Sequence, residues 1–286
     1  MKNLRKVFGI VVVAAIIGFA FFGCEEDTGP SVNVPAAKDL PAAPAGVTSI
    51  QNETQAMELI ESISGNFAEF GEIFTSHFME IFYEELEKLG FDFSSEDEPN
   101  FSIGFGRSIT ISGTDQIDFD EENGTIKGNV SVKIVNEQVS NSIVNGNLSA
   151  NINIKMGEED FSGSVGGSIN GKIIFDEDNF LGSGEIDASL STTVNNNGNV
   201  NLKVNAAASM GLTIFNNTTG MKVVVNISGN INETLVGGEM TDAQAERISK
   251  AVKGSLVIYS LDNVQMSEYS FDELLNMINV DEDEDE

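Results

Sequence analysis

Cysteine, histidine and tryptophan are almost absent from this chain of 286 residues, which has one cysteine, one histidine and no tryptophan. A single cysteine excludes a disulfide-stabilised scaffold and a metal site built from several thiolates. A single histidine excludes histidine-rich metal clusters and leaves few routes to Ser-His-Asp catalysis. Basic residues are also scarce, because 15 of them oppose 45 acidic residues and give a formal net charge of −30. Such a chain repels phosphate backbones, so nucleic acid is not an expected partner.

Residues 1–23 have the composition of a secretory signal peptide. Lys2, Arg5 and Lys6 form a basic start, and residues 7–22 form an uncharged, strongly apolar segment. Sixteen residues span about 24 Å as a helix, which is short for a hydrocarbon core of about 30 Å. A basic flank followed by a short apolar segment therefore favours a cleaved signal over a membrane span.

The end of this segment resembles the start of bacterial lipoproteins, in which a small residue precedes a cysteine that is lipidated and becomes the mature N-terminus. Gly23 is that small residue, and Cys24 is the one cysteine of the chain. The bulky Phe21 and Phe22 depart from the common Leu-Ala/Ser-Gly/Ala-Cys pattern. The resemblance implies lipidation of Cys24, a membrane as partner, and a location in the bacterial cell envelope, periplasmic or surface-exposed. The alternative is a signal anchor whose cysteine is incidental.

The remaining chain divides into a tether, a body and a tail. Residues 24–49 hold four of the five prolines and no periodic apolar pattern, which predicts a disordered Pro/Ala tether. Residues 50–280 are expected to form a single α+β domain, and the acidic residues 281–286 a disordered tail. Within the body, apolar residues recur at three- and four-residue steps over 54–89, which predicts a long helix. His77 is interpreted as an ordinary residue of that helix.

After Pro99 the apolar period changes to two, which is typical of strands with one buried face. Three short stretches occur at 101–105, 108–111 and 117–119. Six long alternating runs follow at 125–135, 143–156, 161–175, 180–194, 200–215 and 221–235. The loops between them are rich in Asn, Gly and Asp, so the pattern predicts an antiparallel meander of unusually long strands. One face is apolar, and the other carries mainly Asn, Ser, Thr and Lys.

Capping patterns predict two short helices near the C-terminus. Thr241 and Gln244 form the first capping box, and Ser270 and Glu273 form the second. Residues 255–259 between them are expected to add one strand. The predicted fold class is therefore α+β: a large antiparallel β-meander, one apolar face covered by a long N-terminal helix, and short C-terminal helices.

Small residues occur on the apolar face in all six long runs. Because apolar side chains must stay on one face, parity restricts each register. One allowed set of registers aligns six small residues in a row across the strands: Gly128, Ala150, Gly167, Ala188, Ala206 and Gly229. We expect the sheet to bend or to be approached closely along this row. The row is interpreted as the seat of the Phe-rich helix or, alternatively, as a groove for an acyl chain.

Little in the sequence indicates catalysis or metal binding. The acidic segments 118–124 and 176–179 do not match the EF-hand pattern, because the glycine is misplaced or absent. No Gly-rich phosphate-binding loop stands at a strand-to-helix turn, and no partner histidine supports a nucleophile elbow. We therefore expect neither enzymatic activity nor a cofactor or metal.

The functional hypothesis is a membrane-anchored lipoprotein that binds a lipid or other apolar ligand between sheet and helix. The expected architecture resembles that of periplasmic lipid carriers with a curled amphipathic sheet, although no motif carries this resemblance. The alternative is a non-catalytic structural or interaction lipoprotein that meets a partner through the polar face of its sheet.

Overall fold

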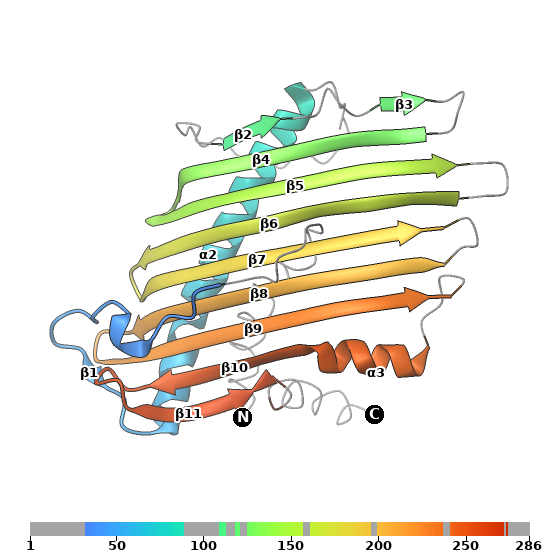
Figure 1. Ribbon diagram of the computed structural model, residues 1–286. Helices are drawn as coiled ribbons and strands as arrows, with labels where there is room; N and C mark the ends of the chain where they lie inside the picture. The colour runs from blue at the N-terminus through green and yellow to red at the C-terminus, as the bar shows by residue number, and fades with distance from the viewer. Residues whose placement is uncertain are drawn as a thin grey trace, which may run out of the picture.

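The computed structural model describes residues 32–88, 109–112, 118–120, 125–156, 161–195, 199–236, 241–271 and 273. The predicted signal peptide, Cys24, the predicted strand at 101–105 and the acidic tail lie outside these residues. Among the described residues, eleven strands form one sheet in the order β11-β10-β9-β8-β7-β6-β5-β4-β2, with β1 paired to β9 and β3 paired to β4 (Figure 1). The predicted large antiparallel meander is therefore confirmed.

The six central strands are the long alternating runs of the sequence. They are β4 (Thr125–Val139), β5 (Ser142–Met156), β6 (Phe161–Glu177), β7 (Phe180–Val194), β8 (Val200–Phe215) and β9 (Thr219–Leu235). The short strands are β1 (Thr48–Ser49), β2 (Ile109–Ser112), β3 (Asp118–Asp120), β10 (Val252–Tyr259) and β11 (Gln265–Ser270). The remaining elements are the 3-10 turn η1 (Ala37–Asp39) and the helices α2 (Glu53–Lys88) and α3 (Asp242–Ala251).

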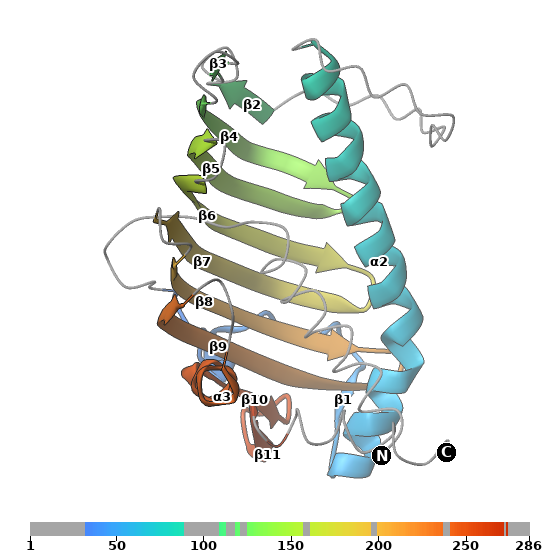
Figure 2. The same ribbon diagram turned by 90° about the vertical axis from the view of Figure 1, so that its right-hand side faces the viewer.

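The long helix α2 lies against the apolar face of the sheet, which we call the inner face; the opposite face is the outer face. Buried apolar residues of α2 form one core cluster with inner-face residues of the sheet: Ala56, Leu59, Ile60 and Ile63 with Phe180, Leu212, Ile214, Met221, Val223 and Val225. Figure 2 shows the helix crossing the strands near one of their ends. The stripe of apolar residues at helical spacing thus covers one end of the inner face.

Residues 32–49 are part of the folded body, so the prediction of a disordered tether is wrong over this range. We call residues 32–44 the strap, because they lie across the outer face of β7–β9 (Figure 1). Thr213 donates its hydroxyl to the carbonyl of Pro41 at 2.6 Å, and Lys222 donates to the carbonyl of Ala37 at 2.9 Å. Specific side chains of the sheet, rather than any periodicity of its own, hold this segment in place.

The chain then passes from the outer face to the inner face around one end of the sheet. β1 pairs in parallel with the start of β9, where Thr48 lies opposite Thr219. Ile50, which is 1% exposed, follows directly and enters the core cluster beneath α2. One continuous segment therefore contacts the outer face and leads into the helix on the inner face.

The predicted pair of short C-terminal helices is not supported. A single ten-residue helix, α3, lies between β9 and β10, and its predicted Thr241–Gln244 capping box is present. The helix ends at Ala251, because the chain returns to the sheet at Val252, where β10 begins. The reciprocal bonds between Ser270 and Glu273 also form, but most of the helix expected after them lies outside the described residues. Strand pairing with β9 overrides the local signal.

The predicted row of small residues is broken by the observed registers. Three of its pairs are confirmed: Ala150 with Gly167, Ala188 with Ala206, and Ala206 with Gly229. Two pairs are wrong: Gly128 pairs with Ile152, and Gly167 pairs with Leu190. Each error is a shift of two residues, which leaves all six small residues on the inner face but divides them among three cross-strand rows.

Candidate functional site

The inner face has two zones that differ in burial. Under α2, the side chains are closely packed: Phe180 and Leu212 are 1% exposed and Met221 is fully buried. Aromatic rings of the helix pack on rings of the sheet here. The ring of Phe67 stacks on that of Phe180 with the centroids 4.2 Å apart, and the ring of Phe70 meets that of Phe175 edge-on with the centroids 5.7 Å apart. This zone is a filled protein core.

The second zone lies at the other ends of the long strands, and we call it the open apolar zone. Its residues are aliphatic, face the inner side by register, and are only partly buried: Leu148, Ile152, Ile154, Val165, Ile169, Leu190, Leu202, Val204, Ile231 and Leu235. Val165 at its centre is 40% exposed. The strands run away from α2 toward these ends (Figure 2), and among the described residues the core cluster that contains α2 includes none of these side chains.

The six small residues lie between these zones or inside the open apolar zone, not under the described part of the helix. Ala206 and Ala188 are 2% and 7% exposed. Ala150 is exposed, and Gly128 and Gly167 lie in cross-strand rows of the open apolar zone. Among the described residues, the core cluster that contains α2 includes none of the six. The interpretation of the row as a helix seat therefore lacks support, and its use as an acyl groove remains a prediction.

A buried polar contact fixes α2 to the sheet at its far end. The Nε2 atom of His77 lies 2.8 Å from the Oε1 atom of Glu137, and the two side chains are 5% and 3% exposed. Glu137 faces α2 because β4 has a bulge between Ile134 and Glu137. His77 was expected to be an ordinary helix residue, so this pair was not predicted. No signal in the sequence links two residues sixty positions apart.

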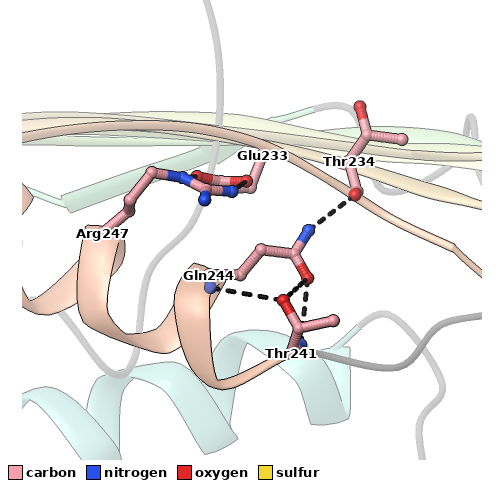
Figure 3. A network of polar contacts seen from close by, with 5 residues as sticks. All are labelled: Glu233, Thr234, Thr241, Gln244 and Arg247. Carbon is pink, nitrogen blue, oxygen red and sulfur yellow. Dashed lines mark hydrogen bonds and ion pairs between the residues drawn. The ribbon is translucent and has the colours of Figure 1, made fainter.

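The rim of the open apolar zone at β9 is closed by α3. Glu233, on the inner face of β9, accepts two hydrogen bonds from the guanidinium of Arg247, at 2.7 and 2.8 Å (Figure 3). Gln244 completes the capping box with Thr241 and donates to the carbonyl of Thr234 at 2.8 Å. The hydrogen bond from Arg247 holds the pKa of Glu233 below its usual range, so the pair stays ionised at neutral pH.

The part of the chain that the structure describes contains no candidate metal site and no candidate membrane-spanning helix. No group of three or more His, Cys, Asp or Glu residues there is placed to hold a metal ion. Within the same residues, no helix combines the length and the apolar character needed to cross a bilayer. Cys24, the candidate lipidation site, lies outside them. Comparison of the chain with known protein families, curated proteins and solved structures finds no match.

Proposed function

We propose that this protein is a lipid-anchored protein of the bacterial cell envelope that holds an apolar ligand against the open apolar zone. The observation that carries the proposal is a continuous zone of partly buried aliphatic side chains beside a helix that covers only the other end of the same face. Large contiguous apolar surfaces on soluble bodies are typical of binding sites. An acyl chain would complete the burial that α2 leaves unfinished.

The chemistry of the zone favours an uncharged, flexible ligand segment. Its walls are aliphatic, and the charged groups of the inner face are already engaged: Glu137 by His77 and Glu233 by Arg247. Full burial of an aliphatic side chain stabilises by about 1.5–3 kcal/mol relative to exposure. Affinity would therefore come from burial rather than from a salt bridge, and the proposed role is binding without catalysis.

The anchor is the second half of the proposal. It rests on the basic start, the short apolar segment and the placement of Cys24 directly after Gly23. Cleavage before Cys24 and lipidation of its thiol would leave the folded body outside the cytoplasm, where exported apolar ligands need a carrier. The mass of the mature N-terminal peptide, isolated from bacterial membranes, tests this half independently of the ligand.

The ligand-binding half is tested with a fluorescent fatty acid titrated into the chain from residue 25 onward, which retains the strap. Val165→Glu places a carboxylate in the centre of the open apolar zone, at a side chain exposed enough to tolerate it. Ser164→Glu is the matched control, because the neighbouring residue points to the outer face. We expect the first variant to lose at least tenfold in affinity and the second to bind like the parent.

Equal affinity of the two variants would contradict ligand binding at this zone. Circular dichroism and urea unfolding of both variants establish that they fold. A loss of binding in both variants would indicate that the charge of the sheet, and not the open apolar zone, determines the affinity for the fatty acid.

A further inference from the structure

The outer face of the sheet carries a charge opposite to that of the whole chain. Every lysine of β4–β10 occupies an outer-face position by register: Lys127, Lys133, Lys155, Lys172, Lys203, Lys222 and Lys253. The carboxylates at outer-face positions of the same strands are Asp176, Glu185 and Asp187. The edge strands add Asp118 and Asp120 of β3 and Glu268 of β11 at outer-face positions. Seven lysines against six carboxylates give the described sheet a formal charge of +1 on this face, in a chain whose net charge is −30.

Most of these lysines stand among neutral polar residues. Lys172 forms an ion pair with Glu185, and Asp118 of the edge strand β3 lies opposite Lys127. The residues opposite the others in the long strands are amides and hydroxyls: Asn147 for Lys133, Thr125 and Ser162 for Lys155, and Ser191 and Asn232 for Lys203. The side chains of Lys133, Lys155 and Lys203 are exposed. They are available to an external anion.

The acidic part of the molecule lies behind this face. The sequence of α2 holds nine glutamates and one lysine, and the helix packs on the inner side. Packed layers are about 10 Å apart, whereas the screening length is about 8 Å at physiological ionic strength. A partner at the outer face therefore experiences mainly the charges of that face, and around Lys133, Lys155 and Lys203 these are positive, even though the chain as a whole is acidic.

Exposed apolar side chains accompany the lysines. Ile143 and Ile174 lie directly opposite each other on the outer face and are 38% and 44% exposed. Val34 in the strap is 43% exposed. The row that contains Ile174 continues through Ser183 to Gly211, which lies beneath the strap. The apolar pair is thus next to the strap, on a face that is otherwise polar.

The strap brings the N-terminal part of the chain onto this same face. The backbone N–H of Asn33 donates to Glu185 at 3.1 Å, and the hydroxyl of Ser209 donates to the carbonyl of Asn33 at 2.8 Å. Seven residues separate Cys24 from Val32, where the strap begins. Even fully extended, they span only about 25 Å. A lipid on Cys24 would hold the membrane close to the outer face rather than at the end of a long tether.

We propose that the outer face lies against an anionic lipid surface, with Ile143 and Ile174 among the headgroups and the exposed lysines beside the phosphates. This rests on the proposed anchor at Cys24. Lysine attraction to anionic lipid contributes about 1 kcal/mol per residue near the surface. The open apolar zone is on the opposite face, so a ligand enters it from the aqueous side.

The test uses the full chain, purified from bacterial membranes and reconstituted into vesicles of phosphatidylethanolamine and phosphatidylglycerol. An environment-sensitive fluorophore is attached at Ile174→Cys and, as the matched control, at Glu69→Cys, which is exposed on α2. Lipids brominated on their acyl chains are expected to quench the label at position 174 at least threefold more than the label at 69. Lys133→Glu with Lys155→Glu should reduce this difference, whereas the matched arginine pair should preserve it.

Equal quenching at the two positions, or stronger quenching at 69, would overturn the proposal. If the fluorescence of the label at 174 is unchanged by the vesicles but changes with an anionic polysaccharide, the membrane proposal is overturned in favour of a polymer ligand. An unmodified Cys24 in the N-terminal peptide would refute the anchor. Quenching of the vesicle-bound protein would still show which face of the sheet lies against the lipid. Failure of the fatty-acid titration leaves this readout unchanged, so the two proposals fail separately.

Discussion

Gly211 offers a sharp test of the strap, because it lies on the outer face of β8 directly beneath it. A Cβ atom at this position would lie 2.6 Å from Cδ2 of Leu40 and closer still to Cγ of Pro35. Carbon atoms in contact are normally 3.5–4.0 Å apart, roughly. The proline ring cannot rotate away, so Gly211→Ala must displace the strap from the sheet.

The size of the effect follows from packing. Inserting a methyl group into a filled contact costs about 1–3 kcal/mol. Leu40 is 7% exposed, and Leu40→Ala in a segment at the surface is expected to cost about 2 kcal/mol, at the low end of such truncations. Because Leu40→Ala removes one of the two atoms that the new methyl meets, the double variant should be more stable than the sum predicts, by about 1 kcal/mol.

The assay is urea unfolding of the parent, both single variants and the double variant, in chains that begin at residue 25. Limited proteolysis should cut Gly211→Ala within residues 32–46 faster than the parent. Costs that add within about 0.5 kcal/mol would refute the packing argument, because independent sites behave in that way. Equal rates of proteolysis of the strap in all four chains would also refute the packing argument.

Three further outcomes are expected. His77→Ala removes the contact with Glu137, which is 2% exposed, and should cost about 1–3 kcal/mol in urea unfolding, because a buried carboxylate loses a hydrogen bond; the double variant with Glu137→Ala should recover part of the loss. Gly182→Ala should destabilise by at least about 2 kcal/mol, because Gly182 has φ +153 and a Cβ there would run into the carbonyl oxygen of Gly211; a silent substitution would contradict the geometry. Hydrogen bonds from Lys172 and then from Asn33 lower the pKa of Glu185 in the folded protein. Its contribution to stability is therefore complete above the ordinary glutamate pKa and is lost as the pH falls through the lower folded pKa. Glu185→Gln should reduce the loss of stability at acid pH in pH-dependent unfolding, and an unchanged loss would exclude this contribution of Glu185.

The periodic elements were predictable because their signals are local. Alternation located the six long strands to within a few residues, and the three- and four-residue spacing located α2 to within one residue at each end. Parity also assigned the apolar residues to the correct face, since a shift by two residues preserves the face. These features depend only on neighbouring residues and a buried surface.

The exact registers were not predictable, because turns and bulges decide them. The two-residue turn at Asp178 and Asn179 pairs Glu177 with Phe180 and places Gly167 opposite Leu190. In β4 the strand continues past the expected turn, and a bulge precedes Glu137. Asn136 and Ser140 there have φ of 52° and 56°, conformations that the sequence permits but does not require.

The strap and the division of the inner face were also beyond the sequence, since both are tertiary effects. Proline and alanine in residues 32–44 suggested disorder, yet the segment is held by Ser209, Thr213 and Lys222, which lie more than 170 positions away. The apolar pattern is equally strong at both ends of the strands. Among the described residues, the path of α2 determines which end is filled and which end is the open apolar zone.

Native mass spectrometry shows directly whether the open apolar zone holds a ligand. The chain from residue 25 onward is purified from a bacterial host without detergent and measured before and after organic extraction. If the open apolar zone holds a ligand, the protein carries a reproducible adduct of several hundred daltons, which extraction releases as lipid and which is lost in Val165→Glu but retained in Ser164→Glu. A clean mass with no adduct, from a protein that is stably folded, would contradict it.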